Sequence, residues 1–247
     1  AREIYTRGWR TIKLYFMIGH PEETLEDVQA IADLSRSVLA EGRKVHGKKA
    51  SVNLGVSTFV PKPHTPFQWV PLDTLENIDA KQNLLKRELR AHGLSLRWNN
   101  PAETVLEAFL SRGDRRLGPV IRRAWELGSR FDAWQDHFNP DAWRQAFAEH
   151  GLEMYFYTHR PRALDEVFPW DHLSVAVKKQ FLQEDYLMSR RGETRVDCRD
   201  QCFACGILPR FSRLRSTTPA DAWECPTVKP RHRRGQKQGD IIPLTPA

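Results

Sequence analysis

The residue types with the clearest capacity for chemistry are the four cysteines, which all lie near the carboxyl end of this 247-residue chain. Cys198, Cys202 and Cys205 have the spacing Cys-x3-Cys-x2-Cys, Cys225 follows later, and no cysteine precedes Cys198. Thiolates are soft donors that favour iron–sulfur clusters, zinc and Cu(I). The clustering therefore predicts a metal or iron–sulfur site made by these four residues.

Three interpretations of these cysteines stay open from the spacing alone. Three clustered cysteines with a distant fourth are common in iron–sulfur proteins, which favours a cluster. Structural zinc commonly uses two Cys-x2-Cys pairs, and only Cys202 and Cys205 form such a pair here. The third interpretation is buried thiols without a metal. It is disfavoured because Arg199, Asp200 and Gln201 make a poor core sequence.

The elements that would position a site begin with a short apolar run at residues 11–18, which ends at Gly19. This run predicts a buried parallel strand. Thr24 followed by Asp27 predicts the start of a helix, and Gly42 predicts its end. Residues 50–60 alternate polar and apolar side chains and predict a second strand.

The same alternation of strand and helix continues beyond a proline-rich loop at residues 61–67. Residues 72–91 predict a helix and residues 94–98 predict a third strand. Strand–helix–strand–helix–strand is typical of α/β units with a parallel sheet. Because three strands cannot close a barrel of about eight, we expect an α/β fold that forms the C-terminal portion of a partial (β/α) barrel.

A mostly helical subdomain is predicted after the third strand. Helical patterns occur at about residues 101–112, 115–127, 140–150 and 172–190, and we expect Trp134, Trp143 and Trp170 to be core anchors of this part. The sequence thus predicts four segments, which are the barrel part, the helical subdomain, the cysteine site and a basic flexible tail: residues 1–100, 101–190, 191–226 and 227–247.

Charge is concentrated at the carboxyl end. The net charge is +7, and residues 206–247 contain eight Lys or Arg against three Asp or Glu. Such a tail is commonly a solvated segment, and contact with RNA or another polyanion is the alternative. No stretch reaches the roughly 18 apolar residues of a membrane helix, so we expect no membrane partner. Clustered cysteines without a signal peptide indicate a reducing compartment, and we expect a cytoplasmic protein.

Several motifs, taken together, resemble those of the radical S-adenosylmethionine (SAM) superfamily. Residues 8–24 (GWRTIKLYFMIGHPEET) resemble the fifth-strand region, and residues 59–67 (FVPKPHTPF) resemble the sixth-strand loop. Further motifs are similar to a subfamily whose full-length members have an N-terminal cobalamin-binding-like domain and a C-terminal Cys motif: residues 113–116 (GDRR), 131–134 (FDAW), 169–171 (PWD) and 197–206 (DCRDQCFACG). The resemblance extends over nearly all of residues 1–210.

The resemblance implies a site at the end of the first strand. It places the backbone of Met17, Ile18 and Gly19 near the adenine of SAM, with Glu22 as the acid of a Gly-x-x-Glu motif. The alternative is a tight turn whose acids favour the following helix dipole. In the complete enzyme, SAM would be cleaved reductively at a 4Fe–4S cluster, and the resulting 5′-deoxyadenosyl radical would abstract hydrogen from a substrate.

The resemblance also shows what this chain lacks. The catalytic cluster of the family needs Cys-x3-Cys-x2-Cys near the first barrel strand, and no cysteine precedes Cys198. The later motif has this spacing, but only 42 residues follow Cys205, too few for a barrel of ~250 residues. We therefore expect an auxiliary iron–sulfur or zinc site, in a fragment that lacks the N-terminal half.

Two functions remain open for such a fragment. In the first, it is part of a radical SAM enzyme, is inactive alone, and has the missing N-terminal half as its partner. In the second, it is a metal-stabilised module that binds RNA or protein through its basic tail. A salt-dependent affinity for RNA would be typical of the second function.

Overall fold

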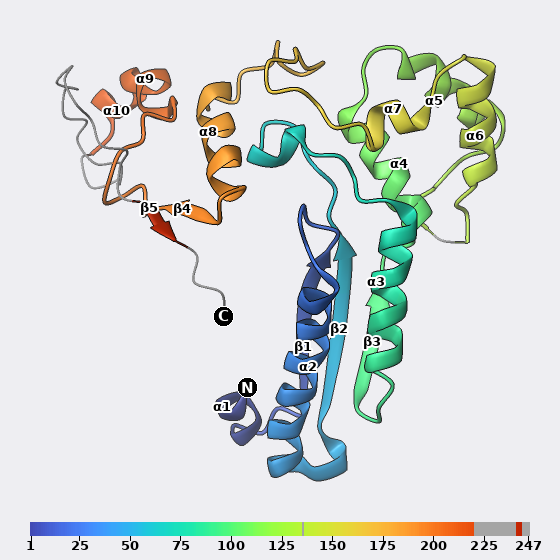
Figure 1. Ribbon diagram of the computed structural model, residues 1–247, viewed down its shortest axis with the longest axis vertical. Helices are drawn as coiled ribbons and strands as arrows, with labels where there is room; N and C mark the ends of the chain where they lie inside the picture. The colour runs from blue at the N-terminus through green and yellow to red at the C-terminus, as the bar shows by residue number, and fades with distance from the viewer. Residues whose placement is uncertain (135, 220–240, 244–247) are drawn as a thin grey trace. The chain divides into compact units, whose positions relative to one another are not determined.

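The computed structural model describes residues 1–134, 136–219 and 241–243 (Figure 1). The chain divides into two compact units, one made of residues 1–61 and 70–162 and the other of residues 62–69 and 163–247. This division differs from the segments expected from the sequence. The first helices after residue 100 belong to the same unit as the strands, and the second unit combines the loop at residues 62–69 with residues 163–247.

The first unit contains the predicted parallel sheet. Its strands are β1 (Thr11–Ile18), β2 (Ser51–Thr58) and β3 (Leu94–Trp98), in the order β1-β2-β3 with both pairs parallel. Helix α2 (Leu25–His46) connects the first two strands and α3 (Leu75–Glu88) lies between the second and third (Figure 1). The mixed α/β class with parallel strands is therefore confirmed.

The core of this unit lies on one face of the sheet. Val52, Leu54 and Val56 of β2 are buried, and they share a cluster with residues of α2 and α3 such as Val28 and Leu85. Burying each such side chain stabilises the fold by about 1.5–3 kcal/mol. Both helices therefore cover the same face of the sheet.

The prediction that residues 11–18 form a buried parallel strand holds for only one face of β1. Ile12, Leu14 and Phe16 pack against the core, whereas the alternate side chains of this strand are exposed. Successive side chains of a strand point to opposite faces, so a single layer of helices buries only every second one.

Helix α2 begins as predicted and ends later than predicted. Thr24 and Asp27 form a reciprocal capping box at its start. Gly42 does not end the helix, because it lies against α1 (Arg2–Thr6). A Cβ at Gly42 would lie 2.5 Å from Cζ of Tyr5, so glycine permits a close approach here, and the helix continues to His46 before the 3-10 turn η1 (Gly47–Lys49).

Four helices complete the first unit: α4 (Pro101–Arg112), α5 (Leu117–Glu126), α6 (Pro140–Glu149) and α7 (Met154–Thr158). Their shared core contains Phe109, Val120, Trp143 and Phe147. Trp143 is buried, as predicted. Trp134 is 63% exposed, so its prediction as a core anchor is wrong. It lies in a turn between α5 and α6, where the described residues 128–134 and 136–139 are not helical.

The second unit is smaller. It contains η2 (Pro66–Trp69), α8 (Lys179–Ser189), α9 (Ile207–Arg210) and α10 (Ser212–Thr217), with the antiparallel strands β4 (Glu193–Arg195) and β5 (Ile241–Pro243). Trp69, Phe168, Trp170 and Leu182 form its core. The predicted anchor Trp170 is buried, and its indole N–H donates to Gln68 Oε1 at 2.8 Å.

Candidate functional site

The most structured group of polar side chains lies at the C-terminal ends of β1 and β2. Gly19 follows β1 in the left-handed region, with φ +86°. A Cβ there would lie 3.6 Å from Cγ2 of Thr58, the last residue of β2, and 3.5 Å from Cβ of Asp73. Ligands of parallel α/β sheets bind beyond this edge, so these residues define the candidate site.

A buried ion cluster fixes this edge. Lys81 Nζ lies 2.7 Å from Glu23 Oε2 and 2.8 Å from Asp73 Oδ2. The exposed fractions of the three side chains are 7%, 9% and 15%. The backbone N–H of Gly19 donates to the same Glu23 oxygen at 2.7 Å. Glu23 therefore links the turn after β1 to helix α3.

The charges of this cluster are coupled. Burial alone would lower the pKa of Lys81, but hydrogen bonds to Asp73 and Glu23 outweigh it and raise that pKa above its ordinary value. Lys81 is therefore protonated at neutral pH and positions the two carboxylates rather than acting as a base. Burial lowers the pKa of His159, and contact with the main chain of Asp73 offsets part of this effect.

The residues that the resemblance assigned to SAM binding have different environments. Ile18 and Gly19 are buried, and Met17 is 45% exposed. Glu22 is exposed, with φ +65°, and the acid that reaches back to the strand end is Glu23. No observation tests the binding role of Met17, Ile18, Gly19 and Glu22, which stays a prediction.

At this strand end, some backbone groups form hydrogen bonds and others face away from β2. Ile18 O accepts from Phe59 N at 2.8 Å and Gly19 N donates to Glu23. Arg10 O accepts from Ser51 N at the start of β2, and Ile18 O accepts from Phe59 N directly after it. Because backbone direction alternates along a strand, the peptide groups of Met17 face away from β2.

An aromatic pair lies beside these backbone groups. The His20 imidazole stacks on the Phe59 ring, with centroids 4.5 Å apart and an interplanar angle of 27°. His20 follows the turn glycine after β1, and Phe59 follows the last residue of β2. The pair therefore offers a flat surface at the edge where the candidate site lies.

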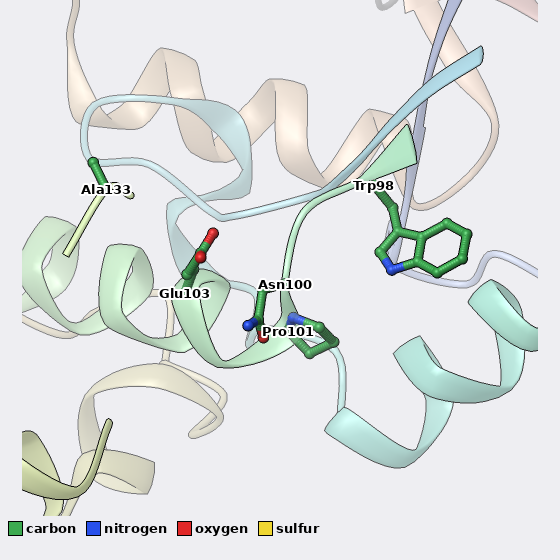
Figure 2. Close-up of a pocket in the computed structure, with 5 residues that line it drawn as sticks. All are labelled: Trp98, Asn100, Pro101, Glu103 and Ala133. Atoms are coloured by element: carbon green, nitrogen blue, oxygen red, sulfur yellow. The ribbon is translucent and has the colours of Figure 1, made fainter. Parts of the chain in front are cut away.

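A separate pocket lies at the C-terminal end of β3. It has a volume of about 230 Å³ and is lined by Trp98, Asn100, Pro101, Glu103 and Ala133. Figure 2 shows the Trp98 ring and the Glu103 carboxylate on opposite sides of the corner made by Asn100 and Pro101. The pocket is smaller than the about 300–1,000 Å³ typical of ligand sites, and Asn100 already caps α4 through Ala102 N.

The cysteine segment lies in the second unit. Cys198 is exposed, Cys202 and Cys205 are partly exposed, and all three are free thiols. Cys205 O accepts from Lys178 N at 2.8 Å, and Gly206 follows with φ +119°. No three His, Cys, Asp or Glu side chains within residues 1–134, 136–219 and 241–243 form a group suited to a metal.

Other sequence predictions lie partly beyond the described ranges. Cys225 and most of the basic tail, residues 227–240 and 244–247, are outside them. The four-cysteine site and the RNA contact therefore stay predictions. In the described part of the chain, no helix combines the length and the apolar character needed to cross a membrane.

Sequence reasoning missed three residues of the ion cluster. Glu23 stands four residues after Gly19, Asp73 lies in a loop, and Lys81 lies in the middle of α3. Lys81 shares a helix face with Ile78 and Leu85, which are both buried, and this periodicity was a signal that could have found it.

No protein-family model matches the chain, and no solved structure matches it. A curated protein of Methanocaldococcus jannaschii, described as uncharacterized, is 32% identical over 114 residues. The match covers 46% of this chain and 24% of that protein, so the chain spans about a quarter of the relative's length.

Proposed function

We propose that this chain is part of a radical SAM iron–sulfur enzyme, in which the C-terminal edge of the β1-β2-β3 sheet forms part of the SAM pocket. The supporting observation is that this edge combines a glycine turn, a buried ion cluster and a stacked aromatic pair at the ends of two parallel strands. The motif resemblance of residues 8–24 and 59–67 supplies the assignment to SAM.

The residues at this edge fit an adenosine group in three respects. Gly19 presents no side chain beyond the strand end. Met17 has a peptide N–H and C=O that face away from β2, which are the groups that recognise an adenine edge. The stacked rings of His20 and Phe59 offer a flat surface of the kind on which bases stack.

The ion cluster has a positioning role in this proposal. Glu23 accepts from Gly19 N, and Lys81 holds Glu23 from α3, so the turn keeps its conformation before a ligand binds. Such preorganisation reduces the free energy needed to order the site on binding. When bound, SAM would supply the one-electron chemistry that follows its reductive cleavage.

The chain does not supply the catalytic cluster. No cysteine precedes Cys198, so the ligands of that cluster would come from a partner polypeptide or from residues outside this sequence. We therefore propose that this chain alone does not cleave SAM. Cleavage of SAM by the isolated chain, after anaerobic reconstitution with iron and sulfide, would contradict this part of the proposal.

The cysteine segment would hold an auxiliary iron–sulfur cluster or a zinc ion. Cys198, Cys202 and Cys205 fit this role chemically, since they are free, accessible thiols in one short segment, and Cys225 would be the fourth ligand. They are not gathered in the described structure, and metal binding would gather them, as in small metal-dependent modules. Free clustered thiols also favour a reducing compartment such as the cytoplasm.

The proposal is tested by saturation-transfer NMR of SAM with the chain and two glycine variants. Gly19→Ala and Gly8→Ala are matched, because both residues have positive φ, at opposite ends of β1. We expect saturable SAM binding with a Kd of about 1 mM or lower. This binding should be lost in Gly19→Ala and kept in Gly8→Ala. No saturation transfer to wild type, or equal loss in both variants, would overturn the proposal.

A further inference from the structure

On the face of the sheet opposite α2 and α3, the side chains are exposed or partly exposed, and no described residue of the first unit buries them. Its side chains come from alternate positions of the three strands, in rows fixed by the parallel register. They are Thr11, Lys13, Tyr15 and Met17 on β1, Ser51, Asn53, Gly55 and Ser57 on β2, and Ser95 and Arg97 on β3. We call this set the uncovered face.

The uncovered face is polar where a packing surface would be apolar. Parallel sheets normally bury both faces under apolar layers. Here Tyr15 is 78% exposed, and Lys13, Ser95 and Arg97 are exposed as well. Serine, threonine and asparagine fill most of the other positions. Such a surface favours water and a polar ligand over a second layer of apolar helices.

The charge of this face is entirely positive. Lys13 and Arg97 are its two ionised residues, and none of its positions holds Asp or Glu. Within the part of the chain that the structure describes, neither cation has an ion-pair partner. Most other basic residues of the first unit's helices differ in this respect, for example Arg36, which pairs with Asp33 and Glu88.

Gly55, at the centre of this face, gives room for the Tyr15 ring. Lys13 shares a row with Asn53 and Ser95, and Arg97 shares the next row with Gly55 and Tyr15. The Tyr15 ring lies over Gly55, where a Cβ would be 3.1 Å from Tyr15 Cδ1. Lys13 and Arg97 are two strands apart, roughly 10 Å across the sheet, so their long side chains can contact one ligand from two sides.

We propose that the uncovered face binds a small ligand with at least two anionic groups, phosphate or carboxylate, through Lys13 and Arg97. The Tyr15 hydroxyl and the polar side chains of Asn53 and Ser95 would donate further hydrogen bonds. The statement that this ligand is the substrate of the enzyme rests on the proposed function. The statement that this face binds anions rests only on the residues of the sheet.

The test is calorimetric titration of the chain with inorganic pyrophosphate and, separately, with citrate at low ionic strength, where exposed charges are least screened. The variants are Lys13→Gln with Arg97→Gln and, as a control of equal charge change, Lys48→Gln with Lys49→Gln in the exposed turn before β2. A third pair, Lys13→Arg with Arg97→Lys, conserves the charge.

In the Lys13→Gln, Arg97→Gln variant only, we expect the binding of at least one probe to weaken tenfold or more. This is the effect expected from the loss of about two charged hydrogen bonds. The preferred probe identifies phosphate or carboxylate as the anionic group. Absence of binding of both probes to wild type, or equal weakening in the control pair, would overturn the inference. Pyrophosphate or citrate binding without SAM binding would contradict the proposed function and leave the anion site standing.

Discussion

The Lys81 ammonium lies 2.7 Å from Glu23, a residue 58 positions earlier in the chain, with both side chains less than a tenth exposed. Glu23 belongs to the turn after β1, and Lys81 belongs to α3, which precedes β3. This ion pair therefore connects the C-terminal end of β1 to helix α3. The resemblance places a cofactor at that end of β1.

Replacing Lys81 with methionine should destabilise the protein strongly. Removing one partner of a buried ion pair leaves the other charge uncompensated, and here two carboxylates, Glu23 and Asp73, would lose their cation. We expect a loss of about 3–5 kcal/mol in the free energy of unfolding, measured by urea denaturation. Lys86→Met, an exposed lysine on the same helix, should change it by less than about 0.5 kcal/mol.

The contribution of Lys81 should depend on alkaline pH. Its pKa is raised in the folded state, so its stabilisation is fully present below the unfolded pKa of about 10.4 and is lost as pH rises through the folded pKa. The difference in unfolding free energy between wild type and Lys81→Met should therefore stay constant up to about pH 10 and shrink as the pH rises further. A difference that already shrinks well below about pH 10 would contradict the assignment.

Two adjacent glutamates give a matched pair. Glu23→Gln should cost about 1–3 kcal/mol, because it removes the charge that accepts from Gly19 N and pairs with Lys81. Glu22→Gln, at an exposed position, should cost less than about 0.5 kcal/mol. The Gly19 amide resonance should move in the first variant only. The reverse order would return the structural role to Glu22.

Trp143 and Trp134 compare a buried with an exposed tryptophan in the first unit. Trp143→Ala should cost about 3–5 kcal/mol, because its ring packs on Phe109 in the helical core. Trp134→Ala should cost less than about 1 kcal/mol, since this side chain is mostly exposed. Denaturation curves of the two variants check this, and similar losses would mean that Trp134 is a core anchor after all.

Anaerobic purification with iron, zinc and sulfide analysis tests the cysteine site. We expect bound metal in wild type and its loss in Cys202→Ala, because the three thiolates of the Cys-x3-Cys-x2-Cys segment and Cys225 would share the ion or cluster. Iron with sulfide would identify a cluster, and one zinc per chain would identify a structural zinc site. Metal-free wild-type protein, or unchanged metal in the variant, would contradict the prediction.

Local patterns predicted the elements of the sheet well, because strand alternation and helix capping depend on neighbouring residues. Residues 11–18 form β1 with the predicted bounds, and the capping box of Thr24 and Asp27 is present. The end of α2 was less predictable. Whether Gly42 ends a helix or packs within one depends on Tyr5, a contact between distant residues.

The candidate site was also hard to predict from the sequence, because it depends on contacts between residues that are distant in the chain. The strand end and Gly19 follow from the apolar run. Lys81, the ion-pair partner of Glu23, comes from a helix 58 residues away, and Asp73, the other partner of Lys81, comes from a loop. A lysine within an amphipathic helix reads as solvent-exposed unless its helical face is examined. For Lys81 that face contains Ile78 and Leu85, which are buried.

The most direct test of the account is to map SAM onto the chain by amide chemical-shift perturbation, with ¹⁵N-labelled protein. The account predicts that the largest shifts occur at the C-terminal strand ends, at Met17, Gly19, His20 and Phe59, while Gly8 and Trp9 at the other end of β1 do not move. Shifts confined to other regions, or no shifts at millimolar SAM, would contradict a SAM site at this edge of the sheet.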